Sequence, residues 1–117
     1  MARHPALALM AGLLLAASAA GAAEEQVLAE RQWQDPATIE AAAARPALHQ
    51  TVATYLATDD AWVRVAHAGG ARGSAWAHEV RNWLIALGVP GARIQIDPGM
   101  AERAHLRLAV HQRGDRL

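Results

Sequence analysis

The chain has 117 residues, with eleven basic and eleven acidic side chains, so its formal net charge is zero at pH 7. All basic residues are arginine and cysteine is absent, which excludes disulfide bonds and leaves a buried core to stabilise the fold. A near-neutral surface gives no electrostatic basis for binding nucleic acid or an anionic membrane, and we predict neither partner.

The N-terminal 23 residues have the pattern of a secretory signal peptide. A basic start precedes an apolar run over residues 6–17 and small residues over 18–23. The apolar run of about a dozen residues is shorter than the roughly 20 that a membrane span needs. We expect cleavage after Ala22 or Ala23, with an uncleaved membrane anchor as the alternative. The processed protein is therefore predicted to be periplasmic or secreted and not membrane-spanning.

The remaining sequence is the size of one small domain. We interpret residues 24–34 as a lead-in segment, residues 35–112 as a single α+β domain and residues 113–117 as a flexible tail. Within the lead-in, residues 26–29 fit either a short strand or an irregular stretch, and the sequence leaves both open.

Two helices are predicted at the start of the domain. Asp35 as N-cap and Pro36 as first helical residue indicate a helix over residues 37–44, which are good helix formers. Pro46 interrupts this helix because proline lacks an N–H, and a second helix is predicted over residues 47–57. Its apolar residues recur at helical spacing and are expected to face the core: Leu48, Val52, Tyr55 and Leu56.

A strand, a glycine-rich loop and a third helix follow. Residues 62–66 predict a strand with both valines inward and Arg64 outward. The loop over residues 69–73 has three glycines, which permit positive φ or a close backbone approach. Ser74 is the expected N-cap, and Gly88 is the expected stop. The helix between them should bury one face: Trp76, Val80, Trp83, Leu84 and Leu87.

Two further strands are predicted, over residues 93–97 and 105–112, and residues 98–99 are expected to turn the chain. The first should point both isoleucines inward. The second alternates most clearly, with Leu106, Leu108 and Val110 on one side and His105, Arg107, Ala109 and His111 on the other. This alternation indicates a sheet covered on one face and exposed on the other.

The order of elements predicts the fold class. The strand–helix–strand section over residues 62–97 should form a right-handed parallel crossover, and the last strand should run antiparallel to its sequence neighbour. Helices on one face of a small mixed sheet form an α+β two-layer sandwich.

Several short motifs between residues 46 and 97 occur in the order strand, glycine loop, helix and strand. They are Val-Arg-Val-Ala-His at 63–67, Gly73, Val-Arg-Asn-Trp-Leu at 80–84, Gly-Val-Pro at 88–90 and Arg-Ile at 93–94. In this order they resemble the OmpA-like peptidoglycan-binding domain family, over about half of the processed chain. The resemblance implies a non-enzymatic envelope protein that binds peptidoglycan and needs no cofactor or metal.

The resemblance also implies where a ligand would bind. In that family an aspartate after the strand-end turn and an arginine early in the next helix hold the amine and carboxylate of diaminopimelate in the stem peptide. Here Gly69 stands at the aspartate position and Trp76 at the arginine position, and Arg72 is near enough in sequence to supply a guanidinium. The candidate ligand-binding residues are therefore His67, Gly69, Gly70, Arg72 and Ser74.

Other interpretations of these polar residues stay open. His67 either contacts a ligand at the carboxyl end of its strand or is a turn histidine bonded to backbone. Ser74 lacks the surroundings of a nucleophile, and the glycine loop lacks the ending of a phosphate loop. His105 and His111 would be about 20 Å apart along an extended strand, too far to share a metal ion. No acid–base pair or nucleophile constellation is visible, so no enzyme activity is predicted.

The tryptophans and the polar sheet face carry the remaining hypotheses. Trp76 and Trp83 are expected in the core, Trp62 is the candidate exposed aromatic, and Trp33 is expected to pack on the start of the first helix. As an alternative function, the chain is an assembly partner of another envelope protein. It would bind through an uncovered sheet edge or through its polar face: Arg64, His105, Arg107 and His111.

Overall fold

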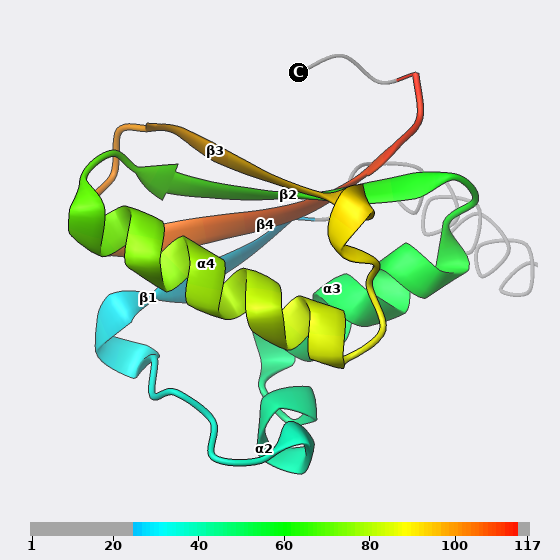
Figure 1. Cartoon of the computed structure of the whole chain (residues 1–117), viewed down its shortest axis with the longest axis horizontal. Helices are drawn as coiled ribbons and strands as arrows, with labels where there is room; N and C mark the ends of the chain where they lie inside the picture. Colours follow the sequence, from blue (N-terminus) through cyan, green and yellow to red (C-terminus); the bar gives the residue numbers. More distant parts are fainter. Residues whose placement is uncertain (1–24, 115–117) are drawn as a thin grey trace, which may run out of the picture.

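The computed structural model describes residues 25–114 and has an α+β fold of two layers (Figure 1). In chain order the elements are β1 (Glu25–Ala29), η1 (Glu30–Gln32), α2 (Ile39–Ala43), α3 (Pro46–Ala57), β2 (Ala61–Ala68), α4 (Ala71–Ala86), η2 (Gly91–Arg93), β3 (Ile94–Met100) and β4 (His105–Gln112). The predicted signal peptide lies outside the described residues. No helix within residues 25–114 is long and apolar enough to cross a membrane.

The four strands form one mixed sheet in the order β1-β4-β2-β3. β2 and β3 are parallel and are joined through α4, as the strand–helix–strand pattern predicts. β4 runs antiparallel to β2, and so opposite to β3, but it lies between β1 and β2 instead of beside β3. Pro98 within β3 cannot donate a ladder hydrogen bond, which suits β3 to the edge of the sheet.

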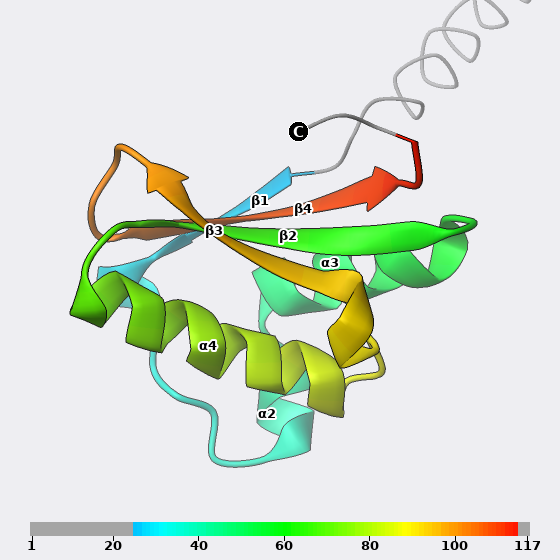
Figure 2. The same ribbon diagram turned by 45° about the horizontal axis from the view of Figure 1, so that its top comes forward.

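The helices cover one face of the sheet, which confirms the predicted two-layer sandwich. α3 packs against β1, β4 and β2, and α4 packs against β2 and β3. Figure 2 shows the helices on one side of the sheet and no described element on the other. Seven of the inward residues predicted for the strands and α4 are buried in the core between the layers: Val63, Val65, Val80, Leu84, Leu106, Leu108 and Val110. The other five are only partly buried against this core: Trp76, Trp83, Leu87, Ile94 and Ile96.

The segment that the sequence left undecided is a strand. β1 pairs with β4 over its whole length, from Glu25 opposite Ala109 to Ala29 opposite His105. The sheet therefore begins well before residue 35, the predicted start of the domain. At the other end, the N–H of Arg113 donates to the carbonyl of Asp60 at 2.9 Å, and residues 115–117 of the predicted tail lie outside the described residues.

Two helix starts differ from the prediction. α2 begins after Thr38, whose hydroxyl accepts the N–H of Ala41 at 3.1 Å, so Thr38 and not Asp35 is the N-cap. α4 begins at Ala71 after Gly70, which has a φ of +106°. Ser74 is thus inside the first turn, where its N–H donates to the carbonyl of Gly70 at 3.0 Å. In both places a neighbouring residue with suitable backbone geometry takes the capping position.

Two further expectations are wrong. Leu56 was expected to face the core, but it is 68% exposed because it lies in the last turn of α3, and Thr51 occupies the buried side of that helix. The chain does not turn at residues 98–99, because β3 continues to Met100 with a register irregularity opposite Ala68. The chain reverses instead before β4, at Ala104, which has a φ of +64°.

Candidate functional site

A cavity of about 390 Å³ lies where β2 ends and α4 begins, and we call it the rim pocket. Backbone of the glycine loop forms part of its wall. Its side-chain lining combines charged and aromatic groups: Glu30, Arg72, Trp76, Arg103 and His105. A neighbouring cavity of about 450 Å³ shares three of these residues, Glu30, Arg72 and His105.

The sheet topology explains why these residues meet. β1 and β2 both run antiparallel to β4, so the carboxyl ends of β1 and β2 lie beside the start of β4. Glu30 directly follows β1, Arg72 is in the first turn of α4, and Arg103 comes two residues before β4. Segments from three distant parts of the chain therefore supply one carboxylate and two guanidinium groups to one pocket.

The two guanidinium groups in the pocket differ in their partners. Arg72 Nε lies 2.8 Å from Glu30 Oε2, and the Arg72 side chain is 84% exposed. An exposed ion pair of this kind contributes little to stability and exchanges partners easily. Arg103 forms no ion pair with any residue from 25 to 114. The pocket thus offers a cation without an ion-pair partner among the described residues, beside an easily opened ion pair.

The structure brings three of the five predicted site residues to the pocket. Gly69, Gly70 and Arg72 line it, whereas His67 and Ser74 do not. His67 is buried on the helix-covered side of β2, and its Nδ1 lies 2.7 Å from the carbonyl oxygen of Ala68. This is the turn histidine bonded to backbone that the sequence left as one alternative.

Gly73 has a steric role beside this histidine. A Cβ at residue 73 would overlap the carbonyl oxygen of Ala68 and would lie 3.2 Å from His67 Nδ1. The glycine loop therefore combines the two uses that the sequence indicated, since Gly70 supplies positive φ and Gly73 permits close approach.

Sequence reasoning missed Glu30 and Arg103. Both are adjacent to strand ends, but Glu30 follows a strand that local patterning left undecided. The signal that finds them is the pairing of β1 with β4, because the carbonyl of Ala104 accepts the N–H of Glu30 at 2.8 Å. Recognising this pairing places residues 30 and 103–105 at the same rim.

The connection from β1 to α2 is fixed along α4 by tryptophans. Trp33 Nε1 donates to Glu79 Oε1 at 2.7 Å, and its ring centroid lies 6.4 Å from that of Trp76. Trp83 Nε1 donates to Asp35 Oδ1 at 2.9 Å. Trp33 therefore packs against α4, and the guanidinium of Arg45, between α2 and α3, lies 5.6 Å from its ring centroid.

The open face of the sheet has its own charge pattern. Arg64 pairs with Asp97, and Arg107 lies 3.0 Å from Glu25 and 2.6 Å from Glu102. Hydrogen bonds from Arg64 and from the N–H of Gly99 hold the pKa of Asp97 below its usual value. Hydrogen bonding between Arg107 and Glu102 lowers the pKa of Glu102 and raises the pKa of Arg107. Local partners thus hold both arginines in place.

The remaining aromatic and histidine candidates lie on this open face. Trp62, expected to be exposed, is partly buried and stacks on His111 with ring centroids 4.7 Å apart. His105 is at the opposite end of β4. Within the described part of the chain, no three histidine or acidic side chains are grouped in a way that could hold a metal ion.

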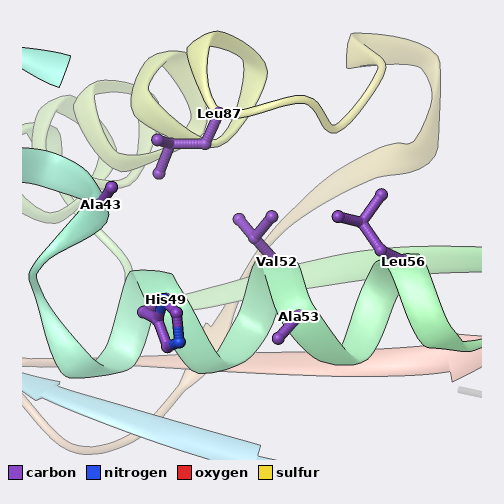
Figure 3. Close-up of a pocket in the computed structure, with 6 residues that line it drawn as sticks. All are labelled: Ala43, His49, Val52, Ala53, Leu56 and Leu87. Atoms are coloured by element: carbon purple, nitrogen blue, oxygen red, sulfur yellow. The ribbon is translucent and has the colours of Figure 1, made fainter. Parts of the chain in front are cut away.

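A third hollow lies between the helices. It has a volume of about 250 Å³ and is mainly apolar, with residues from α2, α3 and the end of α4 around it (Figure 3). Val52 and Leu56 of α3 and Leu87 after α4 line it, and among the described residues His49 is its one ionisable lining residue. It has no paired polar groups to orient a small polar ligand.

Comparison with known proteins adds no family assignment. No protein-family model matches the sequence, and no curated protein matches it either.

Proposed function

We propose that this chain is an exported, non-enzymatic envelope protein that binds the stem peptide of peptidoglycan in the rim pocket. The observation that carries the proposal is the presence of Glu30, Arg72 and Arg103 in one cavity, with Arg103 forming no ion pair among residues 25–114. An amino acid with a free ammonium and a free carboxylate presents the charges that this set complements. Diaminopimelate in a stem peptide is such a residue.

The chemistry assigns a role to each charged group. The Glu30 carboxylate accepts hydrogen bonds from the ligand ammonium, and the Arg103 guanidinium donates two hydrogen bonds to the ligand carboxylate. Arg72 leaves Glu30 as the ammonium arrives and joins Arg103 on the carboxylate. Glu30 and the two arginines would thus replace the aspartate and arginine that the resembling family has at the positions of Gly69 and Trp76.

The order of elements supports the same proposal. α3, β2, the glycine loop, α4 and β3 follow one another as in the OmpA-like pattern that the sequence motifs resemble. The predicted signal peptide agrees with this function, because a protein that binds the cell wall must be exported. N-terminal sequencing of the protein recovered from the periplasm tests the predicted export. Cleavage after residue 22 or 23 agrees with the prediction, and an intact Met1 contradicts it.

Co-sedimentation with purified peptidoglycan tests the binding function. The protein expressed from the full sequence should pellet with peptidoglycan and be released by excess soluble stem peptide. Arg103→Ala and Glu30→Gln should each reduce the bound fraction, because each removes one half of the charge recognition.

The matched control is Arg113→Ala, which removes the same charge from the opposite end of the sheet. It should bind as the wild type does. A wild-type protein that stays wholly in the supernatant contradicts the proposal. Equal losses of the bound fraction in Arg103→Ala and Arg113→Ala would show that binding depends only on overall charge and not on the rim pocket.

One observation favours the alternative of an envelope assembly module. The open face of the sheet is covered by no described element, and Val27 of the edge strand β1 is 50% exposed on it. Pairing of this edge with another envelope protein would extend the sheet. Cross-linking in intact cells distinguishes the two functions: a single protein adduct that Val27→Arg abolishes favours assembly, and its absence favours wall binding alone.

A further inference from the structure

Within the described part of the chain, the indole N–H of Trp76 is a buried donor without an acceptor. Its nitrogen has essentially no access to solvent, and no residue from 25 to 114 accepts its hydrogen bond. The neighbouring tryptophans behave differently, because Trp33 donates to Glu79 and Trp83 donates to Asp35. A buried donor without a partner is unfavourable and therefore calls for an explanation.

The position of Trp76 supplies that explanation. Trp76 lines the rim pocket together with Glu30 and Arg72. Its ring rests on Trp33, which is itself held by Glu79, so a modest movement of the indole is resisted on that side. On the pocket side the lining includes Arg72, whose side chain is 84% exposed and whose ion pair with Glu30 opens at little cost.

We propose that Trp76 Nε1 donates a hydrogen bond to a neutral peptide carbonyl of the ligand in the rim pocket. This inference rests on the proposed function and specifies its ligand: a diaminopimelate residue within a peptide and not the free amino acid. Binding of the ligand charges by Glu30 and Arg103 separates Glu30 from Arg72 and places the peptide next to Trp76 in the same pocket. The peptide carbonyl next to the charged residue then reaches Nε1.

A neutral acceptor fits this donor better than a carboxylate does. An indole N–H is one uncharged donor, whereas a guanidinium offers a charged pair of donors. A carboxylate placed on the indole nitrogen would lose its hydration without a compensating charge, and a carbonyl would lose less. The replacement of an arginine by Trp76, which the family resemblance implies, thus changes the acceptor that this position recognises.

Trp76→Phe is the variant that tests the inference, because it keeps an aromatic ring and removes the donor. Calorimetric titration of the full protein should use two probes: a diaminopimelate-containing stem tetrapeptide and free diaminopimelic acid. The variant should bind the tetrapeptide about tenfold more weakly than the wild type and the free amino acid equally well. Trp62→Phe is the matched control, because Trp62 stacks on His111 at the far end of β2 from the pocket, and this variant should keep wild-type affinity for both probes.

A second measurement needs no variant that could misfold. In the wild-type protein labelled with ¹⁵N-tryptophan, the tetrapeptide should move one indole proton downfield, and free diaminopimelic acid should not. Equal affinity of Trp76→Phe and wild type for the tetrapeptide overturns the assignment of Trp76 alone, as does an equal loss for both probes. A wild type that binds neither probe overturns the proposed function and this assignment with it.

Discussion

The indole nitrogen of Trp33 donates to the carboxylate of Glu79 at 2.7 Å, although the two residues are 46 positions apart in the sequence. Two further contacts, Arg72–Glu30 and Trp83–Asp35, also join α4 to the connection after β1. The three α4 residues lie on one side of that helix, since positions three, four or seven apart share a face. The two tryptophan hydrogen bonds therefore fix the connection that carries Glu30 along α4, and they keep the carboxylate in the rim pocket when the exposed Arg72–Glu30 ion pair opens.

Removal of the Glu79 carboxylate should destabilise the fold. Glu79→Ala leaves the partly buried Trp33 N–H without its acceptor, at a cost of about 1–3 kcal/mol in the free energy of unfolding. Urea denaturation measures this cost. Glu40→Ala, an exposed glutamate on α2 with no side-chain hydrogen bond to the described residues, should change the free energy of unfolding by less than about 0.5 kcal/mol. Similar losses in the two variants would show that Trp33–Glu79 does not fix the connection.

The glycine loop offers a matched pair of substitutions four residues apart. Gly73→Ala would push a methyl group into the Ala68 carbonyl, and the required shift should cost about 1–3 kcal/mol of stability. Gly69→Ala should be tolerated, because its Cβ would meet only the Pro98 carbonyl oxygen at an ordinary 3.8 Å. Chemical denaturation of both variants checks the difference. An unchanged midpoint for Gly73→Ala would mean that β2 and α4 do not approach as closely as described.

The sequence predicted the elements whose signals are local and strong. Alternation in β4 and the spacing of Val80 and Leu84 in α4 identified core residues correctly, because a buried face imposes a period on its own segment. Pro46 likewise marked the start of α3, where its missing N–H has no cost. These features depend on neighbours within one or two turns.

The parts that sequence reasoning missed depend on distant partners. β1 is short and its alternation is weak, so only its pairing with β4 identifies it as a strand and brings Glu30 to the pocket. Aspartate is a favoured N-cap residue, but the carboxylate of Asp35 accepts a hydrogen bond from the indole N–H of Trp83 instead. In each case a tertiary contact outweighs a local preference, and such contacts leave no periodic signal in the sequence.

A substitution at Thr38 tests whether this residue, and not Asp35, is the N-cap of α2. Thr38→Ala removes the hydroxyl that accepts the N–H of Ala41 and should lower the free energy of unfolding by about 1 kcal/mol. The effect should appear in thermal or urea denaturation. Gln50→Ala, an exposed residue of α3 with no side-chain hydrogen bond to residues 25–114, should be neutral or slightly stabilising. An unchanged free energy of unfolding for Thr38→Ala would show that another residue caps α2.

The pair of Arg64 and Asp97 should make stability depend on pH in the acid range. Hydrogen bonds from Arg64 and Gly99 hold the pKa of Asp97 in the folded protein below its ordinary value of 3.8. The unfolded chain therefore takes up this proton first as the pH falls. The stabilisation is fully present above the ordinary value and is lost as the pH falls toward the lower folded pKa.

Denaturation midpoints measured from neutral pH into this acid range check the dependence. Asp97→Asn removes the titrating group, so its stability should fall less steeply below about pH 4 than that of the wild type. Asp59→Asn is the control, because this exposed side chain makes no hydrogen bond or ion pair with the described residues, and it should follow the wild-type curve. Parallel acid curves for the wild type and Asp97→Asn would show that Arg64 does not stabilise the ionised carboxylate, since the pair would then contribute equally in both protonation states.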